Sequence, residues 1–138
     1  MENMQIMDAQ ITVSSRNGNK LMAYYGRLNL LPGNISMGTW SVQYDNDQQW
    51  LQVDFGKKMA IGKVATQGRG DQDEWVISYS LSYSLDTNHF EDYKHCGHIK
   101  VRFYARHDIT FEKLKGLLLA TEVGRGSGDV TTFFILLN

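Results

Sequence analysis

Apolar and polar residues alternate with a period of two along much of the first two-thirds of the chain. In the segment WLQVDFG, the apolar residues Leu51, Val53 and Phe55 fall on one side of an extended backbone, while Gln52 and Asp54 fall on the other. Successive side chains of a β-strand point to opposite faces of its sheet. The spacing therefore predicts a half-buried strand over this segment.

The longest alternation predicts a second strand between residues 75 and 85. Its apolar positions alternate with Val76 and four serines, and the apolar set is Trp75, Ile77, Tyr79, Leu81, Tyr83 and Leu85. We expect the apolar face to lie on a core and the serine face to lie in water, as is typical of antiparallel sandwiches.

Segments rich in turn-forming residues separate the predicted strands. They occupy residues 16–20, 31–34, 44–49 and 68–74. Short strands at this spacing favour an all-β fold, either a sandwich or a barrel.

The last third of the chain has a weaker pattern. Residues 99–106 alternate and predict a further strand, whereas residues 111–120 have roughly helical spacing that Gly116 interrupts. The uncharged end of the chain, residues 131–138, is a strand candidate that has to be buried, because an exposed apolar strand promotes aggregation.

Composition and charge restrict the class of protein. The chain has 138 residues, of which 42% are hydrophobic and 21% are charged, as in one ordinary globular domain. Its 14 basic and 15 acidic residues give a net charge of −1, and the basic residues form no cluster. Both observations argue against a nucleic-acid partner. No apolar run approaches the roughly 18–20 residues of a membrane helix. The start, MENMQIMDAQ, shows no secretory signal, and the single cysteine, Cys96, excludes an intrachain disulfide.

Charge is distributed unevenly along the chain. Residues 1–93 contain seven basic and eleven acidic side chains, a net charge of −4, whereas residues 94–138 contain seven and four, a net charge of +3. All three tryptophans lie in the first part. This change of character indicates a boundary near residue 93.

Four segments of the first part resemble the discoidin-type domain, also called the coagulation factor V/VIII C-type domain. The segments are DAQITVSS, GRLNL, WSVQYDNDQQWLQVDFG and KVATQGRGDQDEWVISYSLSYSLD, and the resemblance runs in order over residues 8–93. It implies a jelly-roll antiparallel β-sandwich. It also implies a non-catalytic recognition module of an extracellular or cell-surface protein, since members of the family bind phospholipid head groups, sugars, collagen or protein ligands.

The resemblance stops after residue 93. The family's Gly-Asn-rich turn, late tryptophan and closing cysteine have no counterpart in residues 94–138, and Cys96 falls too early to be that cysteine. We therefore predict a discoidin-like core in residues 1–93, followed by a divergent or truncated segment, residues 94–138, that replaces the usual closing strands. A truncated product without stable function is an alternative.

The resemblance places the binding site in loops at one end of the sandwich, which correspond to residues 16–25, 44–49 and 68–74. The first of these loops has basic and apolar side chains together, and its candidate residues are Arg16, Lys20, Leu21, Met22 and Tyr24. Apolar tips beside cations suit an anionic phospholipid surface such as phosphatidylserine. Alternatively, these side chains fold back onto the sheet.

The second and third loops are polar. Their candidate residues are Asp45, Asp47, Gln48, Arg69, Asp71 and Asp73. Carboxylates, amides and a guanidinium suit bidentate hydrogen bonds to sugar hydroxyls or to a cationic group of a protein ligand. They equally suit ordinary turns, in which Asp and Asn bond their own backbone.

Two short motifs add further hypotheses. Arg69, Gly70 and Asp71 spell the tripeptide that integrins recognise, and an exposed loop would present both charges. Residues 34–36, Asn-Ile-Ser, form an acceptor sequence for N-glycosylation in a predicted loop, which matters only in a secreted chain.

Evidence for catalysis is thin. His95, Cys96 and His98 place three potential metal ligands within four residues, and His107 is a candidate fourth. Structural zinc normally uses two separated pairs, and solvated histidines explain these residues more simply. We expect no cofactor. The predicted function is adhesion to cells or matrix through carbohydrate or protein ligands. A phosphatidylserine-binding module is the first alternative, and a small metal-dependent hydrolase is the alternative from another class.

Overall fold

The computed structural model describes residues 6–59, 61, 64, 66–69, 71, 72, 75, 76, 78–95, 98, 99, 103, 104 and 130–137. Two short 3₁₀ helices, η1 (Asp8–Gln10) and η2 (Ala23–Gly26), are the helical elements of this part of the chain. All its other regular elements are strands, as the alternation of residues predicts. No helix within these residues is long and apolar enough to cross a bilayer.

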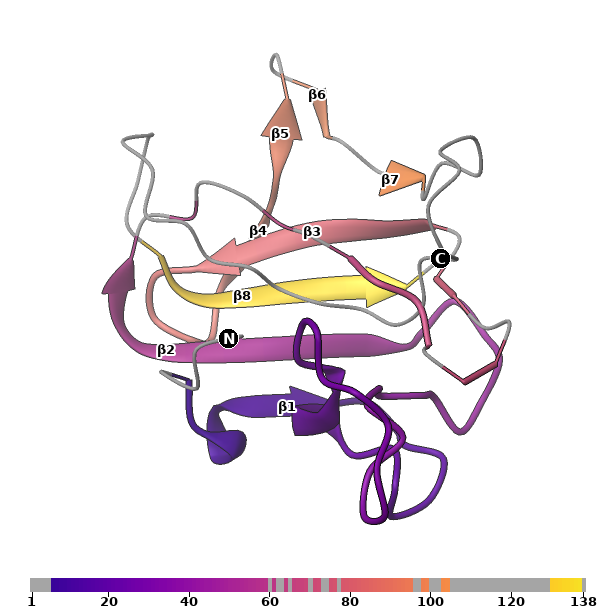
Figure 1. Ribbon diagram of the computed structural model, residues 1–138. Coiled ribbons are helices and arrows are strands. Elements are labelled where there is room, and N and C mark those ends of the chain that lie inside the picture. The colour runs from indigo at the N-terminus through magenta and orange to yellow at the C-terminus, as the bar shows by residue number, and fades with distance from the viewer. Residues whose placement is uncertain are drawn as a thin grey trace.

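The main sheet is antiparallel. Its strand order is β1 (Ile11–Val13), β2 (Trp50–Met59), β8 (Val130–Leu137), β3 (Ser78–Ser84) and β4 (Phe90–Asp92), and β7 (Phe103–Tyr104) also pairs with β3 (Figure 1). A separate hairpin joins β5 (Lys94–His95) to β6 (His98–Ile99). The predicted strand over residues 99–106 is thus represented by β6 and β7, and residues 100–102, 105 and 106 lie outside the described part.

The last strand of the chain lies in the middle of the sheet. In β8, Ile135 is opposite Leu51 of β2 on one side and opposite Leu81 of β3 on the other. The strand expected at the end of the chain is confirmed, and both of its main-chain edges are paired. The helical spacing of residues 111–120 lies outside the described residues. That the segment from residue 94 replaces the family's usual closing strands stays a prediction.

The core lies against the face of β2 that the sequence predicts. Leu51, Val53 and Phe55 are 1%, 0% and 5% exposed. Other buried members of this core come from η2, from the loops and from β3, and they include Ala23, Trp40, Tyr79 and Leu81. Long connections between strands therefore complete the core.

The serine face of β3 is buried, so the expectation that it lies in water is wrong. Ser78, Ser82 and Ser84 are 7%, 9% and 1% exposed. β3 is an internal strand with neighbours on both edges, and its two faces are covered. A serine is small enough to be covered there, and a buried hydroxyl needs only a hydrogen-bond partner. Asp92 Oδ1 accepts a hydrogen bond from Ser82 Oγ at 2.9 Å.

The direction of the strands brings three loops to the same end of the sheet. β1 ends where β2 begins, since Val13 is opposite Leu51, and β8 runs antiparallel to both β2 and β3. The segments that follow β1, precede β2 and precede β3 therefore all leave from this end, on the right of Figure 1. We call it the loop end.

Candidate binding surface

A buried glutamine connects two of the segments at the loop end. Gln49, at 5% exposure, immediately precedes β2. Its Oε1 accepts hydrogen bonds from Ser14 Oγ at 2.8 Å and from Ser15 Oγ at 2.5 Å. Its Nε2 donates to Asn46 Oδ1 at 2.7 Å. One carboxamide thus ties the segment after β1 to the loop before β2.

The two serine hydroxyls extend this network into the backbone. Ser14 Oγ accepts from the amide of Trp50 at 3.0 Å, and Ser15 Oγ accepts from the amide of Gln43 at 3.1 Å. The indole Nε1 of Trp40 donates to the carbonyl of Ser15 at 2.8 Å. Each hydroxyl is both a donor and an acceptor, so the buried polar groups of the network satisfy one another.

The loop of residues 44–48 is held in a turn that leaves its charged side chains outside. Asn46 Oδ1 accepts from the amide of Gln48 at 3.1 Å in addition to its bond from Gln49. This is a turn in which a side chain bonds the backbone two residues on. Asp45, Asp47 and Gln48 are exposed, as expected of the second loop. Asn46 therefore forms the turn, while Asp45, Asp47 and Gln48 provide the polar surface.

The first loop does not lie as the phospholipid hypothesis requires. Arg16 and Lys20 are exposed, but Leu21 is 8% exposed and Met22 is half-buried, with Arg16 Nη1 in contact with Met22 Sδ. Tyr24 packs against the core. The structure favours the alternative, in which these side chains fold back, for Leu21, which is buried, and for Tyr24, which packs against the core.

Tyr24 also contacts a second aromatic ring, away from the loop end. Its ring meets that of Tyr25 edge-on, with centroids 4.6 Å apart and planes at 66°. Loss of hydration raises the pKa of Tyr25, and the Tyr24 hydroxyl and the Asp8 carboxylate raise it further. Asp8 belongs to η1, beyond the opposite end of β1. The first loop therefore runs from Arg16, which follows β1 at the loop end, to Tyr24 in η2, which contacts η1.

The third loop contains an internal ion pair. Arg69 is 8% exposed, and its guanidinium bonds the carboxylate of Asp71 at two points. The expectation that both charges are presented to solvent is wrong for Arg69, because its own loop supplies the partner of its side chain. Gly70 and Asp73 lie outside the described residues.

Two exposed aromatic residues at the loop end were not among the sequence candidates. Tyr44 is 57% exposed, at the start of the second loop, and Trp75 is 44% exposed, three residues before β3 begins. The alternation assigned Trp75 to the apolar face of a strand, but the ladder starts only at Ser78. A signal for Tyr44 was present, because it is the first residue of the turn-rich segment 44–49.

The described residues do not bring together the groups proposed for a metal-dependent hydrolase. His95 and His98 are opposite each other in the β5–β6 hairpin, while Cys96 and His107 lie outside the described part. Within that part, no three His, Cys, Asp or Glu side chains are placed to hold one metal ion.

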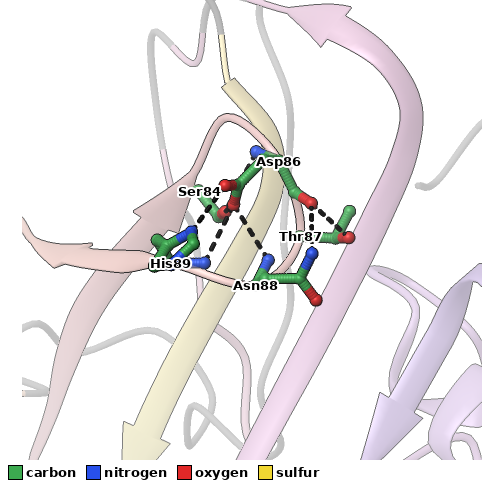
Figure 2. Close-up of polar contacts among 5 residues, drawn as sticks. All are labelled: Ser84, Asp86, Thr87, Asn88 and His89. Carbon is green, nitrogen blue, oxygen red and sulfur yellow. Dashed lines mark hydrogen bonds and ion pairs between the residues drawn. The ribbon is translucent and has the colours of Figure 1, made fainter.

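A serine, an aspartate and a histidine do meet in the turn between β3 and β4 (Figure 2). Asp86 accepts from Ser84 Oγ at 3.1 Å, and its other oxygen lies 2.6 Å from His89 Nδ1. A nucleophilic serine needs the histidine as its base, whereas here the 1% exposed Ser84 bonds the carboxylate instead. The cluster closes a turn: Asp86 also accepts from the amides of Asn88 and His89 at 3.0 and 2.9 Å.

Structures of other proteins share this fold. Discoidin II of Dictyostelium discoideum matches with a TM-score of 0.70 and 20% identity over 93% of this chain, which spans 48% of the length of discoidin II. The family 32 CBM of Clostridium perfringens NanJ, in complex with galactose, matches with a TM-score of 0.57 and 15% identity, covering 96% of this chain and 85% of that one. The lectin binding domain of lectinolysin, in a variant complexed with Lewis b, matches with a TM-score of 0.52 and 16% identity, covering 99% and 85%.

These likenesses confirm the β-sandwich fold expected from the sequence. The model of the F5/8 type C domain family matches residues 10–116, a longer stretch than the resemblance seen in the sequence motifs. That match includes most of the chain. The chain therefore belongs to the F5/8 type C domain family.

Proposed function

We propose that this chain is a non-catalytic module that binds carbohydrate at its loop end, in adhesion to cells or matrix outside the cell. The observation that supports this most directly is the loop of residues 44–48, whose backbone is held by buried Gln49 while Asp45, Asp47 and Gln48 remain exposed. A polar surface that is already ordered binds with a smaller entropy loss than a mobile one.

The chemistry of this surface suits a sugar. Carboxylate and amide groups accept and donate hydrogen bonds to vicinal hydroxyls, and Arg16 and Lys20 are exposed donors of the first loop. Tyr44 adds an exposed aromatic ring beside the same turn. Aromatic rings provide flat apolar surface with little loss of conformational entropy, which suits the C–H faces of a sugar ring.

The structural relatives support the same ligand class. The NanJ module was solved with galactose and the lectinolysin domain with Lewis b. Binding by a module of this fold needs no catalytic group, which agrees with the structural role of the Ser84, Asp86 and His89 cluster.

The test is titration of the purified chain with galactose and with the Lewis b oligosaccharide, followed by calorimetry or by NMR shifts. We expect Tyr44→Ala and Asp47→Asn each to weaken binding by about tenfold, the effect of removing one good contact. Phe90→Ala is the matched control, because Phe90 is a 38% exposed aromatic on β4 at the other end of β3. Absence of binding to either sugar, or an equal loss in the control, would contradict the proposal.

A second candidate function is binding to an anionic phospholipid surface. Leu31 and Ile35 are 77% and 76% exposed, and the loop that holds them is bonded to the first loop through Met37 N and the Lys20 carbonyl, at 3.0 Å. Aliphatic side chains beside a cation suit an anionic bilayer interface. The test is binding to vesicles with and without phosphatidylserine, and Leu31→Ser with Ile35→Ser should abolish it.

A further inference from the structure

The loop of residues 31–38 presents an asparagine at its tip. Asn34 is exposed, between Leu31 and Ile35, which are the most exposed large apolar side chains of the described residues. The amide of Gly33 donates to the carbonyl of Ser36 at 2.7 Å, which closes a tight turn around Asn34. A side chain added at Gly33 would meet nothing within 4 Å. The tip therefore has open space at Gly33 and an exposed side chain at Asn34.

The base of this loop is closed by a glycine. Gly38 has φ +67°, and a Cβ on it would lie 2.3 Å from the carbonyl oxygen of Leu30. The amide of Gly38 also donates to Ser36 Oγ at 2.9 Å. The two arms of the loop thus approach closely at Gly38. The position of Asn34 is set by this base and by the turn, and it does not depend on packing of Asn34 itself.

We propose that Asn34 is the acceptor of an N-linked glycan. This proposal rests on the extracellular setting of the proposed function. The sequence Asn34-Ile35-Ser36 has the spacing that the transfer requires, and its middle residue is not proline. The co-reactant is a lipid-linked oligosaccharide pyrophosphate. A bond forms between Asn34 Nδ2 and C1 of the first sugar, and the bond from C1 to the pyrophosphate oxygen breaks. The lipid pyrophosphate leaves with the electron pair and takes up the proton that the amide loses.

The glycan would have a physical effect at this position. Leu31 and Ile35 expose aliphatic surface on a loop whose backbone is held in shape by hydrogen bonds at Gly33 and Gly38. A hydrophilic oligosaccharide attached between them covers that surface and improves solubility. It also keeps the loop away from a bilayer. A glycosylated Asn34 therefore favours the carbohydrate-binding function over the phospholipid-binding one.

The experiment expresses the full chain behind a secretory leader in cultured eukaryotic cells and analyses the exported protein by gel mobility and peptide mass spectrometry. Removal of N-glycans with peptide-N-glycosidase should increase mobility and leave aspartate at position 34. Asn34→Gln and Ser36→Ala should be exported without this shift. Ser36→Thr, which keeps the hydroxyl, should retain it.

Exported protein in which the parent and Asn34→Gln have the same mobility would overturn the proposal. So would a glycan that survives Asn34→Gln. Hydrophobic-interaction chromatography tests the effect on the apolar pair: Asn34→Gln should be retained longer than the glycosylated parent, and Leu31→Ser with Ile35→Ser should remove the difference. Equal retention of parent and Asn34→Gln would overturn the covering role. Sugar titration of Asn34→Gln tests the proposed function separately, because it does not depend on the glycan.

Discussion

Arg69 and Asp71 form a two-point ion pair within one loop: Nε lies 2.6 Å from Oδ1, and Nη2 lies 3.1 Å from Oδ2. The guanidinium side chain is 9% exposed and the carboxylate 31% exposed. A bidentate pair with one buried partner is a rigid local structure, since Arg matches the geometry of a carboxylate. The pair uses the two charges that an integrin would have to contact.

This pair leads to a prediction about adhesion. Asp71→Ala leaves a buried cation with one partner fewer, and we expect a loss of about 1–2 kcal/mol in the free energy of unfolding, reduced from the fully buried case because Asp71 is partly solvated. Integrin-dependent cell adhesion should not change. Urea denaturation and a cell-adhesion assay measure the two effects. Adhesion that falls in Asp71→Glu, with stability retained, would show that the tripeptide is recognised after all.

The Gln49 network should control the order of the second loop. Gln49→Met keeps the length of the side chain but removes the bonds to Ser14, Ser15 and Asn46, so we expect a loss of about 1–3 kcal/mol for the buried polar groups left without this partner. Hydrogen exchange at the amides of Gln48 and Trp50 should accelerate about tenfold or more. Gln52→Met is the control, because Gln52 lies three residues further along, in β2. Unchanged exchange at Gln48 in Gln49→Met would rule out the network as the source of loop order.

Gly38 should tolerate no side chain, unlike Gly33 in the same loop. Gly38→Ala places a Cβ 2.3 Å from the Leu30 carbonyl oxygen, at a φ of +67°. We expect a loss of about 1–3 kcal/mol, since both the left-handed backbone and the close approach oppose a side chain. Gly33→Ala has open space around it and should change stability by less than about 1 kcal/mol. Thermal melting compares the two variants, and equal melting temperatures would contradict the assignment.

The turn between β3 and β4 should respond to pH. The hydrogen bond and charge of Asp86 raise the pKa of His89 above its ordinary 6.5, so the contribution of His89 to stability is present below 6.5 and is lost as pH rises through the folded value. Hydrogen bonds from His89, Asn88 and Ser84 lower the pKa of Asp86 below its ordinary 3.8, so its contribution is present above 3.8 and is lost as pH falls through the folded value.

The turn is thus most stable between about pH 4 and 6.5. Both side chains are exposed, so the effect is local, and NMR titration of the His89 ring is the direct measurement. We expect Asp86→Asn to bring the pKa of His89 back toward its ordinary value. A His89 pKa that does not change in Asp86→Asn would mean that the 2.6 Å contact does not persist in solution.

The sequence predicted β2 and its buried face correctly because a period of two is a local property that survives in any sheet covered on one side. It also predicted the loops that contain the candidate site, since turn residues such as Asn46 act on their own backbone. It did not predict Gln49. A buried glutamine next to Trp50 has no local signal, and its partners Ser14 and Ser15 lie 34 or more positions away in the chain.

The exposed and buried members of each loop were decided by tertiary packing. Leu21 and Leu31 are the same residue type in neighbouring loops, yet the first is 8% and the second 77% exposed, so the place of each leucine in the fold, and not its type, decides its burial. The serines of β3 are buried for the same reason: neighbours on both edges and both faces cover that strand.

By itself, then, the sequence determined the type of structure, the family and the turns, which depend on residues close together in the chain. The tertiary structure alone decided that β8 inserts between β2 and β3, that Gln49 meets Ser14 and Ser15, and that the serines of β3 are buried. Those outcomes depend on which distant segments come into contact, because these contacts, and not the local sequence, decide which side chains are buried.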